Sequence, residues 1–162
     1  MKKITFIGLG VMGFPMAGHL SNQGYKVTVY NRSEEKSKMW IKKYTGNYST
    51  SVKEAVADSD IVFSCVGNDS DLRDITLGHN KAFSGMKAGS VFVDHTTTSS
   101  DIAIELSEIA KDYNIHFLDA PVSGGEVGAL KGELTVMIGG EDLIFDRINS
   151  IISAYAKNIT LI

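Results

Sequence analysis

The sequence contains very little cysteine, because Cys65 is the only one among its 162 residues. A single cysteine excludes an internal disulfide and fits a reducing compartment. Since Cys65 lies inside an apolar run, we expect a small buried side chain rather than a nucleophile. The four histidines lack the spacing and the cysteine partners of a metal site, so we expect no metal.

Long hydrophobic runs and strong charge are also lacking. No segment reaches the roughly 18 apolar residues that span a bilayer, and the start leads into a short strand rather than a signal-length run. The formal net charge is −3 with no basic cluster, which argues against nucleic acid as a partner. No repeat, low-complexity tract or linker divides the chain. We therefore expect a soluble, cytoplasmic protein with one domain over residues 1–162 and no membrane partner.

Short apolar segments alternate with helix-compatible segments along the whole chain. Strands are predicted at 3–7, 27–29, 60–66, 91–94, 115–120, 134–138 and 158–162. Helices are predicted at 15–23, 33–44, 51–59, 69–77, 101–113 and 141–156. This order predicts an α/β fold with a doubly wound, mostly parallel sheet and right-handed crossovers.

Some local features of these elements are predicted in more detail. Ser33 is expected to cap the second helix through its hydroxyl, and Met39 and Trp40 on that helix are expected in the core. Asp69 or Ser70 is expected to cap the helix that ends near residue 77. Segment 44–50 is left unassigned, and 78–89 is predicted to be a loop.

The chain is organised around a glycine turn that follows the first strand. In the spacing Gly8-x-Gly10-x-x-Gly13, the first glycine permits a tight turn and the second lets the backbone approach a pyrophosphate. The third lets the following helix pack closely on the strand, and the N-terminus of that helix attracts phosphate. A second strand with a polar end follows about 20 residues later, where a ribose-binding residue belongs. The turn therefore predicts dinucleotide binding.

Polar or turn-forming residues follow five of the predicted strands, at Gly8, Asn31, Gly67, His95 and Pro121. Because ligands of a doubly wound sheet bind at the carboxyl ends of its strands, we expect these positions to share one rim. His95 is expected to be a loop histidine rather than an acid or base, since no partner is positioned for it.

Two long motifs carry a family resemblance. Segment 6–20, FIGLGVMGFPMAGHL, and segment 119–125, DAPVSGG, resemble the 3-hydroxyisobutyrate dehydrogenase family of β-hydroxyacid dehydrogenases, and the similarity includes segment 132–140. The resemblance implies a Rossmann-type NAD(P)-binding domain from an enzyme that transfers hydride between a nicotinamide cofactor and a small 3-hydroxy acid. Members usually carry a second, all-helical domain that supplies a catalytic lysine and completes oligomers. We therefore expect that domain to be absent here, the lysine beyond Ile162, and a homo-oligomer in the full-length form.

The resemblance also implies roles for individual residues. Cofactor-binding positions are implied for Gly8, Leu9, Gly10, Val11, Met12, Gly13, Asn31, Arg32, Ser33, Val66, Gly67, Thr96 and Thr97. Substrate carboxylate binding is implied for Ser123, Gly124 and Gly125. Val66 and Gly67 depart from the Leu-Pro that relatives typically have. Thr96 and Thr97 are as compatible with helix capping as with cofactor contact.

The sequence also bears on the choice of cofactor, on alternative functions and on a candidate base. NADP is expected to be preferred over NAD, because Asn31 is neutral and Arg32 can bind a 2′-phosphate, although Arg32 is also compatible with a solvated charge. A 6-phosphogluconate dehydrogenase-like domain and a noncatalytic dinucleotide-binding interaction module are the alternative functions. Lys131 is expected to be a solvated charge rather than a base.

Overall fold

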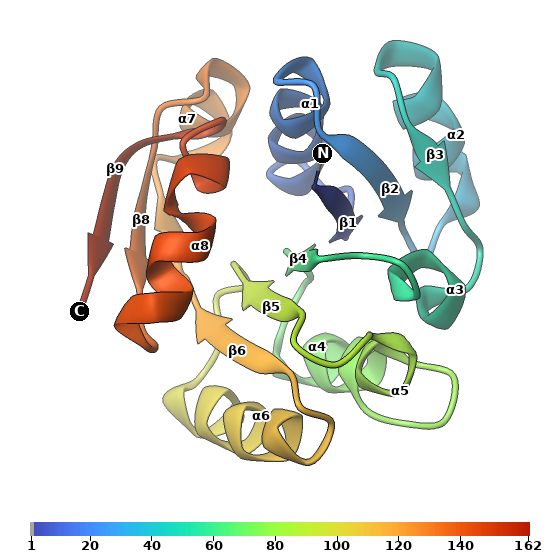
Figure 1. Cartoon of the computed structure of the whole chain (residues 1–162). Helices are drawn as coiled ribbons and strands as arrows, with labels where there is room; N and C mark the ends of the chain where they lie inside the picture. Colours follow the sequence, from blue (N-terminus) through green and yellow to red (C-terminus); the bar gives the residue numbers. More distant parts are fainter. Residues whose placement is uncertain (1) are drawn as a thin grey trace.

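The structure is a computed structural model that describes residues 2–162, and its centre is a six-stranded parallel sheet. The strands are β1 (Lys3–Ile7), β2 (Lys26–Tyr30), β3 (Asn47–Tyr48), β4 (Ile61–Ser64), β5 (Val91–Asp94) and β6 (His116–Asp119). Their spatial order is β3-β2-β1-β4-β5-β6, and every neighbouring pair is parallel (Figure 1). The order reverses between β1 and β4, so the predicted doubly wound Rossmann-type fold is confirmed.

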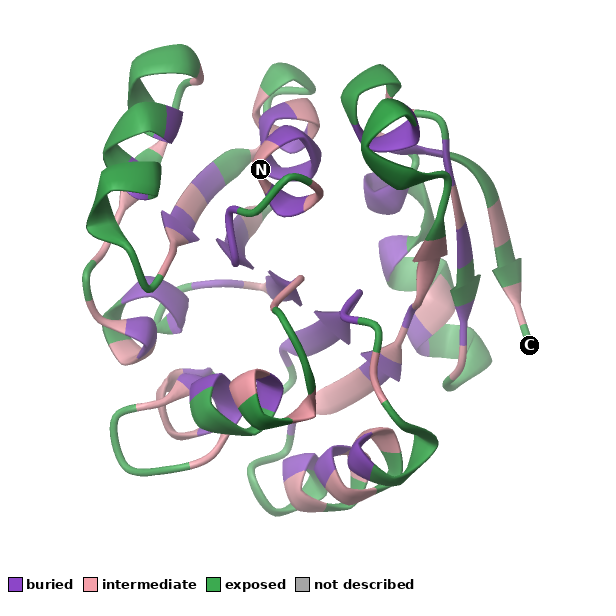
Figure 2. Ribbon diagram, turned by 180° about the vertical axis from the view of Figure 1, so that it is seen from behind, coloured by how far each residue is buried: buried purple, intermediate pink, exposed green. Residues whose placement is uncertain are grey.

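Helices cover both faces of this sheet, and each face has its own apolar core. The helices between the strands are α1 (Gly13–Asn22), α2 (Glu34–Lys43), α3 (Val52–Val56), α4 (Asp69–Thr76), α5 (Ala82–Gly85) and α6 (Ser100–Asp112). Phe6 and Phe63 point to the face covered by α1 and α2, whereas Val62 and Phe92 point to the face covered by α3 to α6. Because successive strand residues face opposite sides, continuously apolar strands such as β4 and β5 are buried on both (Figure 2).

A second, smaller sheet lies against the first core. It contains β7 (Val122–Ser123), β8 (Leu134–Ile138) and β9 (Ala156–Leu161), with α7 (Gly125–Lys131) and α8 (Asp142–Ile152) between them. β7 and β8 are antiparallel, and β8 and β9 are parallel. The main sheet therefore ends at β6, and the three last strands form a sheet of their own. The burial of β8 gives the reason: Leu134, Val136 and Ile138 are buried but Met137 is exposed, which is the alternation of a sheet with one covered face.

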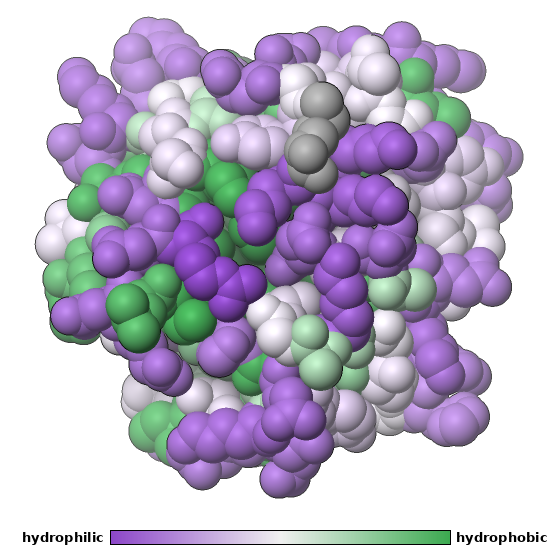
Figure 3. All heavy atoms as spheres, in the orientation of Figure 1, coloured by the Kyte–Doolittle hydropathy of each residue, from purple (hydrophilic) through white to green (hydrophobic). Residues whose placement is uncertain are grey.

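Exposed apolar side chains gather on the side of this second sheet and its helices (Figure 3). The most exposed large ones there are Val127, Leu130, Met137, Leu143 and Ile162. No helix within residues 2–162 combines the length and the apolar character needed to cross a membrane.

Several local predictions differ from the structure. Asn68, rather than Asp69 or Ser70, caps α4, and its side-chain oxygen accepts from the Asp71 backbone N–H at 2.9 Å. Ser33 occupies the N-cap position of α2, but its hydroxyl makes no cap hydrogen bond. Trp40 is buried as predicted, whereas Met39 is 55% exposed, because adjacent helical residues point in directions about 100° apart. The unassigned segment 44–50 contains β3, and the predicted loop at 78–89 contains α5.

Candidate cofactor site

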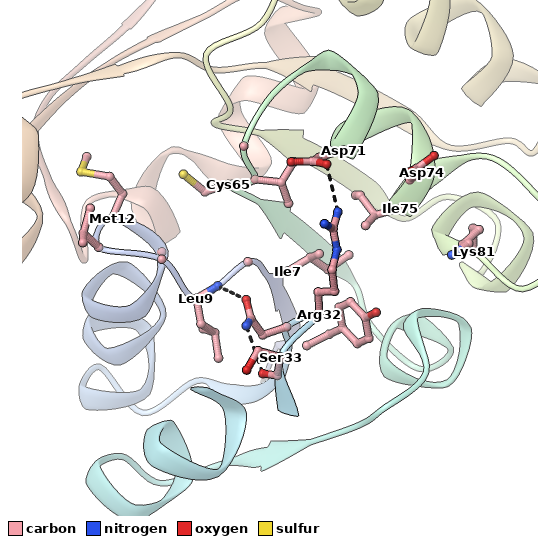
Figure 4. A pocket seen from close by; sticks show the side chains of 18 of the residues that line it. Ile7, Leu9, Met12, Arg32, Ser33, Cys65, Asp71, Asp74, Ile75 and Lys81 are labelled. Carbon is pink, nitrogen blue, oxygen red and sulfur yellow. Dashed lines mark hydrogen bonds and ion pairs between the residues drawn. The ribbon is translucent and has the colours of Figure 1, made fainter. Parts of the chain in front are cut away.

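A pocket of about 950 Å³ opens at the carboxyl ends of β1, β2 and β4, where the strand order reverses (Figure 4). Its lining brings together eleven of the residues predicted for the cofactor: Gly8, Leu9, Gly10, Val11, Met12, Gly13, Asn31, Arg32, Ser33, Val66 and Gly67. The position agrees with the rule that ligands of open α/β sheets bind at this switch point. The volume lies within the usual range for small-molecule and cofactor sites.

The three glycines of the turn have different surroundings. Gly8 has φ +100°, and a Cβ there would overlap the Cys65 carbonyl oxygen at the end of β4. A Cβ at Gly13 would overlap the Gly8 carbonyl oxygen and contact Phe6. A Cβ at Gly10 would meet no atom within 4 Å, although Gly10 lines the pocket. Gly8 and Gly13 are therefore needed for packing, whereas the space beside Gly10 is left open for a ligand.

Asn31 joins the end of β2 to the glycine turn. Its side-chain oxygen accepts from the Leu9 backbone N–H at 2.9 Å, and its side-chain amide donates to the Ser33 carbonyl oxygen at 3.1 Å (Figure 4). Both contacts are internal to the protein. Asn31 thus fixes the shape of the pocket wall, in addition to the ribose-binding position that the resemblance implies.

Arg32 crosses the pocket mouth to α4. Its guanidinium donates to a carboxylate oxygen of Asp71 at 2.9 Å, and this carboxylate raises the pKa of the guanidinium. The Arg32 side chain is 76% exposed, so the pair lies at the solvent-accessible rim. No motif in the sequence pointed to Asp71 or to the other pocket-lining residues of α4 and the start of α5. These are Asp74, Ile75 and Lys81. The available signal was that residues 71, 74 and 75 share one side of a helix that follows a central strand.

Thr96 and Thr97 have different environments. Thr96 is buried, and its hydroxyl accepts from the Val66 backbone N–H at 3.0 Å, which ties the loop after β5 to the pocket wall. Thr97 is exposed. Neither caps α6, because Ser99 is its N-cap and accepts from the Ile102 N–H at 3.3 Å. The capping alternative is therefore wrong.

Ser123, Gly124 and Gly125 do not line the pocket. They lie at the end of β7 and the start of α7, and all three are exposed. Lys131, at the end of α7, is also exposed, as expected of a solvated charge.

The buried carboxyl group of Asp94 lies at the end of β5, next to the loop that contains Thr96. One oxygen of Asp94 accepts from the Ser64 hydroxyl at 2.7 Å and from the Thr96 N–H at 3.1 Å, while the other has no partner among the described residues. Burial raises the pKa of Asp94 to about 6, opposed by the hydrogen bonds from Thr96 and Ser64. Asp94 therefore loses most of its proton only as the pH approaches neutrality.

His95 lies in the loop that follows β5, as predicted, but its ring is buried between the two sheets. One ring nitrogen lies 2.6 Å from the Ala120 carbonyl oxygen and the other 2.6 Å from the Tyr155 hydroxyl, and the ring stacks on Phe63. Burial lowers the pKa of His95 to about 4, so the ring is neutral at pH 7. A neutral ring donates to the carbonyl oxygen and accepts from the hydroxyl, which makes His95 a structural link rather than a base.

Cys65 is half-buried in the pocket wall. Burial raises the pKa of its thiol to about 12, so the thiol is protonated near neutral pH and is a poor nucleophile. Among residues 2–162, no group of three or more histidine, cysteine or acidic side chains is arranged to hold a metal ion.

The sheet order, the glycine turn and the pocket at the switch point together define a dinucleotide-binding domain. The family model described as the NAD binding domain of 6-phosphogluconate dehydrogenase matches residues 3–162. The chain belongs to this family.

Several of its relatives are described as oxidoreductases or dehydrogenases. The chain is 54% identical over 157 residues to an uncharacterized oxidoreductase of Shewanella frigidimarina, covering 97% of the chain and 54% of the relative. It is 40% identical over 156 residues to the probable 3-hydroxyisobutyrate dehydrogenase-like 1 of Arabidopsis thaliana, covering 96% of the chain and 46% of the relative. A solved structure of Mycobacterium tuberculosis 3-hydroxyisobutyrate dehydrogenase with L-serine matches with a TM-score of 0.93 at 28% identity, covering 99% and 54%. The predicted resemblance is confirmed, and the chain spans about half the length of these relatives.

Proposed function

We propose that this chain is the cofactor-binding part of an NAD(P)-dependent β-hydroxyacid dehydrogenase or semialdehyde acid reductase. The observation that carries the proposal is the open space beside Gly10, because protein atoms already occupy the corresponding space beside Gly8 and Gly13, the other two glycines of the turn. A nicotinamide cofactor, when bound, supplies or accepts the hydride. The chain supplies backbone N–H groups at the turn and at the start of α1, which favour a pyrophosphate.

Within this proposal, the substrate is a small 3-hydroxy acid. The solved relative described with L-serine supports this class, because L-serine is itself a small 3-hydroxy acid. The carboxylate is proposed to bind at Ser123, Gly124 and Gly125, where a hydroxyl and backbone amides form an uncharged anion site. The chain alone is predicted to bind cofactor without turnover, because the resemblance assigns the general base to a lysine beyond Ile162. Loss of a general base typically slows such a reaction by about 10²–10⁴-fold.

NADP is the proposed preferred cofactor, because the pocket mouth carries Arg32 and no acidic residue at the end of β2. Cytoplasmic location and a homo-oligomeric full-length form stay predictions. The exposed apolar side chains around the second sheet support the latter.

Calorimetric titration of the chain with NADP and NAD tests the proposal. Gly10→Ala is expected to weaken both by at least about tenfold without lowering stability, because its Cβ enters the ligand space and touches no protein atom. Gly139→Ala is the matched control, since its Cβ would make only one ordinary contact, 3.8 Å from the Asp119 oxygen, outside the pocket. Unchanged affinity in folded Gly10→Ala would contradict the assigned cofactor position.

The choice of substrate distinguishes the proposed function from the 6-phosphogluconate dehydrogenase-like alternative. With the full-length protein, reduction of NADP by small 3-hydroxy acids supports the proposal, whereas reduction only by 6-phosphogluconate supports the alternative. Cofactor binding without turnover of either class would favour the noncatalytic module.

A further inference from the structure

The ion pair between Arg32 and Asp71 joins two sides of the proposed cofactor pocket. Arg32 follows β2 and Asp71 lies in the first turn of α4, and Figure 4 shows the two side chains meeting across the mouth. Of the ion pairs formed by residues 2–162, it is the one in which both members line this pocket. The same guanidinium is the group proposed to bind a 2′-phosphate.

We propose that Asp71 is a specificity-determining residue: it holds Arg32 in an ion pair that competes with a 2′-phosphate, and so limits the preference for NADP over NAD. The inference rests on the proposed function, since it concerns the same pocket.

The competition follows from charge. A phosphate monoester carries about −1.5 to −2 charges at neutral pH, and it binds arginine best through two parallel hydrogen bonds. Asp71 already accepts from one guanidinium nitrogen and places a carboxylate beside it. The 2′-phosphate of NADP must therefore displace the Asp71 carboxylate from Arg32 or bind beside its negative charge. NAD has no phosphate at that position.

Gly67 explains how Asp71 reaches this position. A Cβ at Gly67 would overlap a carboxylate oxygen of Asp71, so the absence of a side chain leaves the space that the carboxylate occupies. The backbone of Gly67 lies outside the left-handed region, so alanine is conformationally compatible there. Gly67→Ala is therefore a second way to move the carboxylate without removing its charge.

The test is the ratio of NAD to NADP dissociation constants, measured by calorimetry at one fixed salt concentration. Asp71→Asn is expected to tighten NADP binding by roughly three- to tenfold and to change NAD binding by less than about twofold. In the Arg32→Ala background, the same substitution is expected to change the ratio by less than about twofold. Gly67→Ala is expected to raise the ratio in the same direction as Asp71→Asn.

Asp74→Asn is the matched control, because Asp74 lines the same pocket on the same helix but makes no ion pair with Arg32. An unchanged or lower ratio in Asp71→Asn overturns the inference, as does an equal rise in Asp74→Asn, which would mean a general charge effect. If the chain with its natural residues binds neither dinucleotide, the proposed function fails as well. If the chain binds a dinucleotide but Asp71→Asn leaves the ratio of dissociation constants unchanged, this inference fails and the proposed function stands.

Discussion

Replacement of the buried Asp94 by asparagine is expected to change how stability depends on pH. Asp94 is 1% exposed, and one of its oxygens has no hydrogen-bond partner among the described residues. Burial therefore raises its pKa from the ordinary 3.8 to about 6. The protonated form carries no charge, whereas the ionised form is a buried charge that destabilises the folded state.

The sign and size follow from proton linkage. Between the unfolded pKa of 3.8 and the folded pKa of about 6, the folded protein binds more protons, so its stability falls as the pH rises. One pKa unit corresponds to about 1.4 kcal/mol, so the loss reaches about 3 kcal/mol near neutral pH. Asparagine cannot ionise. The stability of Asp94→Asn relative to the natural protein should therefore rise by about 3 kcal/mol between about pH 4 and pH 7.

Denaturant unfolding of both proteins across this pH range measures the difference. The free energy of unfolding of Asp94→Asn is also expected to be lower by a constant amount. The asparagine amide leaves a buried donor without a partner, which costs about 1–3 kcal/mol at every pH. Asp119 is present in both proteins, so its contribution to the pH dependence largely cancels in the difference between their stabilities. Ser64→Ala is a control that should move the Asp94 transition to higher pH, since the Ser64 hydroxyl stabilises the carboxylate. A stability difference that stays constant with pH, or falls as the pH rises, would show that Asp94 does not have a raised pKa in the folded protein.

Three further predictions concern buried or closely packed groups. Gly13→Ala should lower the free energy of unfolding by at least about 2 kcal/mol in chemical denaturation, because its Cβ overlaps backbone, and a stable variant would contradict this packing. Tyr155→Phe should cost about 1–3 kcal/mol in the same assay, because one nitrogen of His95 loses its buried donor, and a change under about 0.5 kcal/mol would argue against that hydrogen bond. Cys65 should react with a thiol reagent near pH 8 only after unfolding, since burial raises its pKa to about 12; rapid labelling of the folded protein is the opposing result.

The pocket could largely be predicted from sequence, because its chemistry is local. The glycine spacing lies between a strand and a helix, and its backbone requirements act within a few residues of Gly8 and Gly13. The parallel order then brings the ends of β1, β2 and β4 together without any knowledge of side-chain contacts.

Long-range contacts could not be predicted in the same way. Asp71 reaches Arg32 across 39 positions of sequence, and His95 reaches Tyr155 across 60. Such pairings depend on how separate elements pack, and no local pattern specifies them. The second sheet is an intermediate case, since the alternating burial of β8 can be seen in its sequence but its partners cannot.

The central claim is that the glycine turn and the end of β2 bind a dinucleotide. Backbone amide NMR signals of the chain, followed during titration with NADP, test it most directly. The largest shifts are expected at residues 8–13 and 31–33, which line the pocket at the switch point. Shifts confined to the separate pocket formed by Gly89, Ser107 and Asn114, or no shifts at millimolar NADP, would contradict it.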